Sequence, residues 1–304
     1  SVFLGLDEME GNLPPLLEEA RGVAPHARVS SGYEKLEKDL KERVSEMVRK
    51  GDRRLLSAML VSLMLWPDHP FGWDAVGYDD RGTFVPCAWP ENLDPDIIYP
   101  KEQELIDICQ SEHALGRQVW VYVQFNGAKD VEGRLQRVLS EAGLRVGVLK
   151  AKVPLKDREA WIARNGKDVD VMLSHPRLVE TGLDLFDKGF AGHNFCTLVF
   201  YETGYVLPTL RQASRRAWRL QQPKECKVLY LYYTGTMQER AMALMGKKLI
   251  AAEALEGKFS SEGLVALAGD DGLEMALAKS LVGNIQESAD RSWGKASRAG
   301  RARR

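Results

Sequence analysis

The feature that most constrains the fold is an alternation, from Gln118 onward, of short apolar runs with stretches of helical length. Five runs rich in Val, Leu, Tyr and Phe predict buried strands over 119–125, 145–149, 170–174, 195–201 and 227–232. Helical periodicity and helix-stop residues predict helices over 129–142, 154–164, 207–220 and 236–252. Strands and helices that alternate in this way form right-handed crossovers, and they therefore predict an α/β fold with a parallel sheet flanked by helices.

The residues before about 115 predict a different organisation. Apolar residues keep helical spacing from Tyr33 to Val48, and a more apolar helix follows over 53–66. Asp79-Asp80-Arg81-Gly82 is typical of a hairpin turn. We therefore expect three parts: a helical segment with a small β excursion and linker, a RecA-like α/β domain, and an extension with a mobile basic end, over 1–115, 116–260 and 261–304.

Composition excludes several classes of protein. The net charge of −1 means that any anion-binding surface is local. The four cysteines are far apart and form no CxxC pair, which argues against a zinc site or a disulfide framework and predicts a cytoplasmic location. No signal peptide is visible, and the longest apolar run, 55–66, is too short to span a bilayer. We expect neither a metal site nor a membrane partner.

The stretch Gln212–Gln222 carries the densest concentration of candidate chemistry. Within one predicted helix, Gln212, Arg216 and Arg219 fall on the same face, at positions i, i+4 and i+7. Two neighbouring guanidiniums suit a multiply charged anion, because the planar fork pairs with phosphate oxygens in a bidentate fashion. A solvated basic face on a surface helix is the alternative, and spacing alone leaves both open.

This stretch resembles the last motif of superfamily-two helicases, in the form Gln-Ala-x-x-Arg-x-x-Arg-x-x-Gln that Swi/Snf-type DNA translocases use. The five matching positions are Gln212, Ala213, Arg216, Arg219 and Gln222. The family usually has Gly before the last Gln, where this chain has Gln221. The resemblance implies that Arg219 is an arginine finger, that Arg216 contacts the γ-phosphate of ATP, and that Gln212 orients one or both of them.

Other segments resemble further motifs of this family, in the family's order. Gly182-Leu183-Asp184-Leu185 is similar to the fifth motif, and the strand that ends in Gln124-Phe125 is similar to the fourth. The resemblance implies that Gly182 and Asp184 contact the nucleotide, and that nucleic acid is contacted by Gln124, Thr181 and Gln222. Weaker similarities add Trp66–Pro70, Tyr99–Lys101 and Thr236–Arg240, so that the resemblance extends from about Val29 to Lys258.

The phosphate loop GxxxxGK[ST] and the DExH strand of such enzymes are not found in these 304 residues. We therefore expect the C-terminal half of an ATP-dependent DNA translocase, inactive alone. ATP and magnesium would be held mainly by a missing N-terminal lobe of the same full-length chain, and double-stranded DNA would be the partner. The competing hypothesis is a non-catalytic RecA-like module that binds nucleic acid or protein. A dinucleotide enzyme is disfavoured because no GxGxxG follows a strand.

Overall fold

The computed structural model describes residues 13–124, 129–179, 183–187, 192–204 and 207–256. The chain divides into two compact units, and each draws on separate stretches of the sequence. The first unit comprises Ser1–Glu19, Glu104–Thr203 and Pro208–Leu231. The second comprises Ala20–Gln103, Gly204–Leu207 and Tyr232–Arg304.

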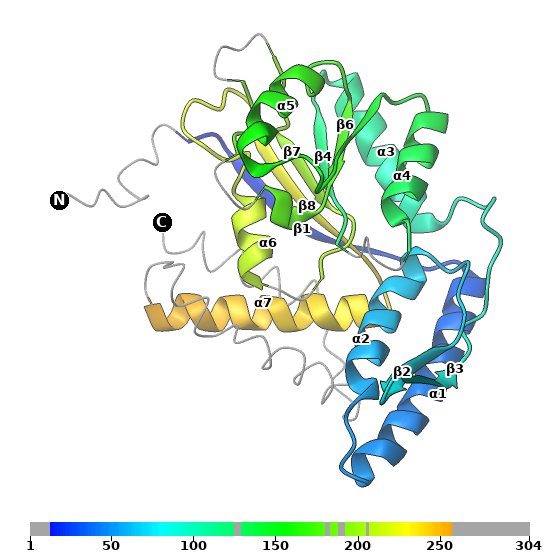
Figure 1. Ribbon diagram of the computed structural model, residues 1–304. Coiled ribbons are helices and arrows are strands. Elements are labelled where there is room, and N and C mark those ends of the chain that lie inside the picture. Colours follow the sequence, from blue (N-terminus) through cyan, green and yellow to red (C-terminus); the bar gives the residue numbers. More distant parts are fainter. Residues whose placement is uncertain (1–12, 125–128, 180–182, 188–191, 205–206, 257–304) are drawn as a thin grey trace. The chain divides into compact units, whose positions relative to one another are not determined.

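The central element is a six-stranded, mainly parallel sheet with the strand order β1-β8-β7-β4-β6-β5 (Figure 1). Its strands are β1 (Leu16–Val23), β4 (Val119–Tyr122), β5 (Val146–Leu149), β6 (Val171–Ser174), β7 (Thr197–Phe200) and β8 (Cys226–Tyr233). In parallel register, β4 pairs with β6 and β7, β5 with β6, and β7 with β8. Every residue of β4, β6 and β7 is buried, which explains why these segments read as continuous apolar runs.

The helices along this sheet are α3 (Pro100–Ala114), α4 (Val131–Glu141), α5 (Arg158–Asn165) and α6 (Leu207–Ser214), and they lie on both sides of the strands (Figure 1). The side chain of Asp130 caps α4 by accepting a hydrogen bond from the Gly133 amide at 2.9 Å. Gly143, with φ +87°, follows the end of α4. The predicted parallel sheet flanked by helices is confirmed.

One strand of the sheet was not expected from the sequence. β1 has the sequence LLEEARGV, in which three of eight residues are charged. It therefore shows neither an apolar run nor a regular alternation. It is a strand because its backbone pairs with β8: the Cys226 amide donates to the Pro15 carbonyl at 2.9 Å, and the Thr234 amide to the Val23 carbonyl at 3.0 Å.

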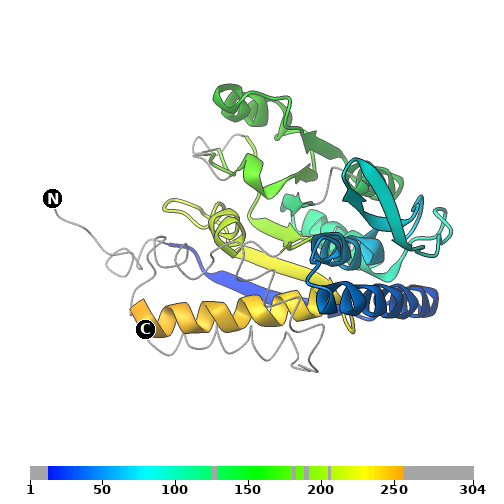
Figure 2. The same ribbon diagram turned by 60° about the horizontal axis from the view of Figure 1, so that its bottom comes forward.

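The second unit contains the predicted helical segment and hairpin. Its elements are α1 (Ala27–Arg49), α2 (Leu55–Leu65), β2 (Val76–Asp80), β3 (Thr83–Ala88) and α7 (Met237–Glu256). Helices α1 and α2 lie side by side, with the β2–β3 hairpin against them (Figure 2). Arg81 and Gly82 take φ values of +54° and +85°, as a two-residue hairpin turn requires, and the Gly82 amide donates to the Asp79 carboxylate at 2.9 Å.

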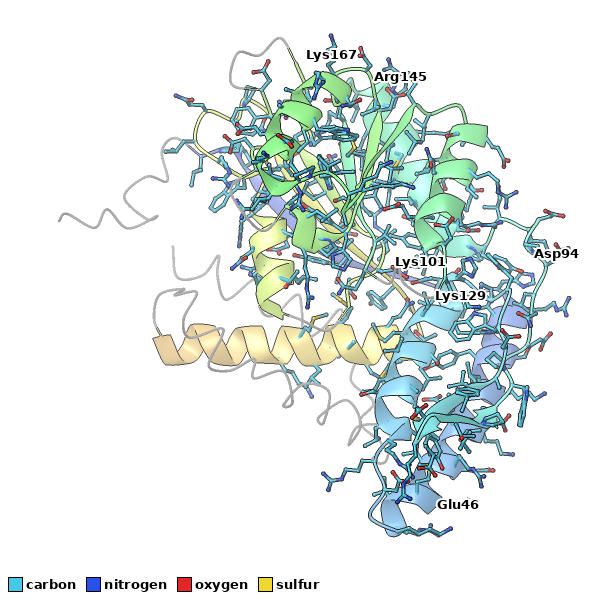
Figure 3. The ribbon with its side chains drawn as sticks, in the orientation of Figure 1. Glu46, Asp94, Lys101, Lys129, Arg145 and Lys167 are labelled. Carbon is cyan, nitrogen blue, oxygen red and sulfur yellow. The ribbon has the colours of Figure 1, made fainter. Side chains whose placement is uncertain are left out.

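A buried polar cluster in the second unit joins three of the segments that the motif order singled out. Lys101, labelled in Figure 3, is 1% exposed, and its Nζ donates to the two carboxylate oxygens of Asp68 at 2.9 and 3.0 Å. The same Nζ donates to Gln238 Oε1 at 3.0 Å, and Gln238 Nε2 donates to Asp68 at 2.8 Å. Burial raises the pKa of Asp68 to about 6, although Lys101 acts in the opposite direction. Since these contacts satisfy each charge, the cluster serves stability rather than chemistry.

Candidate functional site

The carboxyl edge of the sheet is the place where ligands bind in α/β folds of this class. Here the ends of β4 and β7 are tied together. The Gln124 amide, just after β4, donates to Glu202 Oε2 at 2.8 Å. The amides of Tyr201 and Glu202 donate to the Tyr122 carbonyl at 3.1 and 3.3 Å. Glu202 is 3% exposed, so this carboxylate is part of a rigid edge.

The arginine-rich stretch does not form the single helix that its spacing predicts. Helix α6 ends at Ser214, and the chain continues through turns and bends to Gln222. At this end the Ser214 hydroxyl donates to the Arg211 carbonyl at 3.0 Å, and the Arg216 amide donates to the Ala213 carbonyl at 3.2 Å. The prediction that Gln212, Arg216 and Arg219 share one helix face is therefore wrong. Gln212 is exposed on α6, and nothing in the geometry supports its orienting role.

Contacts outside the helix explain why it ends early. Trp218 Nε1 donates to the Pro14 carbonyl, beside β1, at 2.7 Å. The guanidinium of Arg215 lies 4.9 Å from the centre of the Trp218 ring, a cation–π distance. These interactions draw the chain away from the helix axis, and helical periodicity gives no sign of them.

The last two residues of the motif are also held by local geometry. Gln221 has φ +70°, a left-handed conformation that favours glycine, which explains why the motif usually has Gly there. Gln222 is 5% exposed, and its amide forms two hydrogen bonds with the amide of Asn194, at 2.9 and 3.0 Å. This buried amide pair closes the segment, and it does not present Gln222 to a nucleic acid as the resemblance implied.

The two arginines of the motif lie at different places along the strands: Arg216 is near the carboxyl end of β4, whereas Asp184, the partner of Arg219, directly precedes Leu185, whose carbonyl accepts from the Phe195 amide just before β7. Arg216 lies near Tyr122, at the end of β4: burial raises the pKa of this tyrosine, and the charge of Arg216 opposes the rise. Arg219 Nε lies 3.4 Å from Asp184 Oδ1. The side chains of Arg219 and Asp184 are 38% and 23% exposed, so this ion pair is partly open to solvent.

The structure therefore places Gln124 and Arg216 near the carboxyl end of β4, and it pairs Arg219 with Asp184 toward the amino end of β7, all within the first unit. Gly182 and Thr181 lie outside the described residues. The partly exposed guanidinium of Arg219 can bind phosphate oxygens, whereas Nε of Arg216 is buried. Over the described ranges no group of three or more His, Cys, Asp or Glu residues could hold a metal ion. No helix in the described part of the chain is both long and apolar enough to cross a bilayer.

Three residues that position this site were missed. Glu202 follows the strand predicted over 195–201, and the strand-end rule could have identified it. Asn194 and Glu18 had no such signal, because Asn194 precedes its strand and Glu18 lies on the strand that was not predicted.

Comparisons with known proteins concern the fold. No protein-family model matches the chain, and no curated protein does. Among solved structures, the C-terminal part of the Fun30 ATPase domain is similar with a TM-score of 0.59 and 16% identity, over 88% of this chain and 99% of that one. The Sulfolobus solfataricus SWI2/SNF2 ATPase core in complex with dsDNA is similar with a TM-score of 0.58 and 17% identity, over 90% of this chain. The match spans about half of that core, 51% of its length. The chain has the fold of the C-terminal RecA-like lobe of Swi/Snf-type ATPases.

Proposed function

We propose that this chain is the C-terminal lobe of an ATP-dependent translocase on double-stranded DNA, and that it supplies arginines to a nucleotide bound mainly by an N-terminal lobe of the same protein. The observation that carries the proposal is the position of the two arginines after α6: Arg216 lies near Tyr122, at the carboxyl end of β4, and Arg219 forms a partly open ion pair with Asp184. The likeness of the fold and the order of the motifs support it.

In this proposal Arg219 is the arginine finger. Its guanidinium is 38% exposed and lies beside a carboxylate, so a phosphate group can replace Asp184 as its partner. Arg216, held close to Tyr122, is the supporting phosphate contact. An arginine in such a position stabilises the charge that develops on the transferred phosphoryl group, and it contributes about 10³-fold or more to turnover.

The residues present fit the phosphates of a nucleotide better than they fit its metal ion. The guanidiniums of Arg216 and Arg219 offer fixed positive charge, whereas the described residues contain no carboxylate cluster for Mg²⁺. We therefore assign the magnesium ligands to the N-terminal lobe. The bound ion would neutralise charge on the phosphates there.

The decisive experiment uses the protein with both lobes and measures phosphate release with and without duplex DNA. Arg219→Ala is expected to lower DNA-stimulated turnover by about 10³-fold and to leave ATP binding mostly intact. Arg219→Lys should fail as well, because an ammonium group cannot reproduce the bidentate fork. Arg164→Ala, which removes an exposed arginine on α5, is the matched control. Turnover near that of the wild type in either Arg219 variant would refute the assignment.

The same proposal predicts that the 304 residues alone hydrolyse ATP negligibly. Turnover on the order of 1 per second or more by the purified chain would contradict it. The absence of disulfides among the four cysteines fits the reducing cytoplasm to which we assign the protein.

For DNA, we propose contacts through phosphates, with Gln124 and Thr181 among the contacting residues. Binding should be weak, independent of sequence and sensitive to salt, by roughly 0.9 log units per log unit of salt for each phosphate contact. Titration of labelled duplexes of different sequence at several salt concentrations tests this. Tight binding to one sequence that persists at high salt would instead support the competing hypothesis, a non-catalytic module that reads bases.

A further inference from the structure

The structure separates the four arginines between residues 211 and 219 into two pairs. Arg211 and Arg215 lie against Glu18 on β1: Arg211 Nη1 is 2.9 Å from Glu18 Oε1, and Arg215 Nη2 is 3.6 Å from Glu18 Oε2. Arg216 instead lies near Tyr122, and Arg219 pairs with Asp184. The two pairs are adjacent along the chain, with Arg215 directly before Arg216, so sequence alone does not distinguish them.

Glu18 is well suited to hold two arginines. Its side chain is 13% exposed, and Oε1 also accepts a hydrogen bond from the Tyr230 hydroxyl at 2.6 Å. Burial raises the pKa of Glu18, but Arg211, Arg215 and the hydroxyl more than offset this effect, so the pKa lies below its usual value. The carboxylate is therefore ionised at neutral pH, and it compensates the charge of Arg211, which is 8% exposed.

We propose that Glu18 is the positioning residue of the arginine segment. It holds Arg211 and Arg215 against β1, fixes the point at which the chain leaves α6, and thereby directs Arg216 toward Tyr122 and Arg219 toward Asp184. The effect on catalysis rests on the proposed function, whereas the effect on the position of Arg216 does not.

The loss of this one charge has a specific consequence. Without it, the guanidiniums of Arg211 and Arg215 lose the carboxylate that both of them contact. Both lie on the same short segment as Arg216 and Arg219, so their charges compete for Asp184, which binds Arg219, or for a bound phosphate, and this competition displaces the functional pair. A displacement of about 1 Å is enough to lower turnover by about a hundredfold.

Two measurements test the proposal with Glu18→Gln, which preserves shape and removes charge. In the 304-residue chain, NMR of the arginine Nε–H groups should show shifted signals for Arg216 and Arg219. In the protein with both lobes, kcat should fall about tenfold to a hundredfold while KM for ATP changes less than about twofold. Glu19→Gln, at the next position of β1 and on its other face, is the control and should change neither quantity.

A compensating variant separates positioning from general stability. Adding Arg211→Gln and Arg215→Gln to Glu18→Gln removes the competing charges, and it should restore the Arg216 signal and most of kcat. If Glu18→Gln does not fold, Arg215→Gln alone should shift the Arg216 signal, because it removes one of the two contacts with Glu18.

The outcomes are distinguishable. Unchanged Arg216 and Arg219 signals in Glu18→Gln, or in Arg215→Gln if the former does not fold, would overturn the positioning role. Loss of kcat without rescue in the triple variant would overturn it too. If the wild type with both lobes hydrolyses no ATP, the proposed function fails, and the NMR signals still decide the role of Glu18.

Discussion

In the first unit, the buried ion pairs at the starts of the strands and the ion pair of the arginine segment use charge in opposite ways. At the amino edge, Glu112 is 5% exposed and accepts hydrogen bonds from Lys227 Nζ at 2.7 Å and from Arg117 and Thr197. Arg145, labelled in Figure 3, pairs with Asp170 at 2.7 Å at the start of the neighbouring strands. In the arginine segment, by contrast, the ion pair between Arg219 and Asp184 is longer, 3.4 Å, and its arginine is 38% exposed.

This difference shows which ion pairs stabilise the fold and which can exchange their partners. Removing any one of the three donors would leave the buried carboxylate of Glu112 poorly compensated and would lower the stability of the protein. This carboxylate therefore fixes the starts of the strands. A long, half-exposed ion pair contributes about 0–1 kcal/mol, and its partners can be replaced at little cost. The buried pairs of Glu112 and Asp170 therefore stabilise the fold, whereas the pair between Arg219 and Asp184 can be exchanged at little cost.

The largest expected effect that separates these two kinds of site is that of Arg216→Ala. In the protein with both lobes, this variant should lower DNA-stimulated turnover by about 10²–10³-fold, because it removes a fixed charge from the proposed phosphate site. Its free energy of unfolding should stay within about 1 kcal/mol of that of the wild type. Steady-state phosphate release and chemical denaturation measure both quantities. A variant that loses stability and activity together would make Arg216 a structural residue.

The reverse pattern is expected at the amino edge. Glu112→Gln leaves the cations of Arg117 and Lys227 without their carboxylate, and it should lower the free energy of unfolding by about 3 kcal/mol. The folded variant should turn over ATP within about twofold of the wild type. Urea denaturation followed by circular dichroism gives the stability. Glu141→Gln, on the exposed end of α4, is the control.

Low pH should also reveal the contribution of Glu112 to stability. Burial raises the pKa of Glu112, but Lys227, Thr197 and Arg117 together lower it by more than burial raises it. The pKa in the folded protein therefore lies below the ordinary 4.5. A lowered folded pKa contributes stability above the unfolded pKa, and this stability is lost as pH falls through the folded value. Below about pH 4.5 the wild type should therefore lose stability more steeply than Glu112→Gln. Parallel pH dependences of the two proteins would show that Glu112 is not responsible.

Part of the fold could be predicted from the sequence, and part of the candidate site could not. The strands over 119–125 and 170–174 are apolar throughout, so their burial on both faces was visible without a structure. The end of α6 and the pairing of Gln222 with Asn194 depend on contacts between segments far apart in the chain, to which periodicity is blind. The strand β1 was missed because Glu18 and Glu19 interrupt its apolar pattern. A buried carboxylate fits at position 18 because Arg211 and Arg215, far along the chain, compensate its charge.

A smaller effect is expected from Asp184→Asn, which sharpens the idea of an exchangeable pair. Arg219 then no longer has to leave a carboxylate when it binds phosphate, so KM for ATP should fall by up to about fivefold, the worth of one exposed ion pair. The free energy of unfolding should change by less than about 0.5 kcal/mol. A rise in KM would show that Asp184 contacts the nucleotide directly, the role that the resemblance to helicases implies.

The smallest effect concerns Gln221, where the chain departs from the usual glycine of the motif. Its φ of +70° costs a residue with a side chain roughly 1–2 kcal/mol. Gln221→Gly removes this strain but gives the unfolded chain more freedom, which costs about 0.5–1 kcal/mol. The net expectation is a gain of about 0.5 kcal/mol in the free energy of unfolding, measurable by denaturation of both proteins under the same conditions. Gln221→Ala, which keeps a Cβ at the same φ, should give no gain. A loss of stability in Gln221→Gly would mean that the side chain of Gln221 contributes more than its backbone conformation costs.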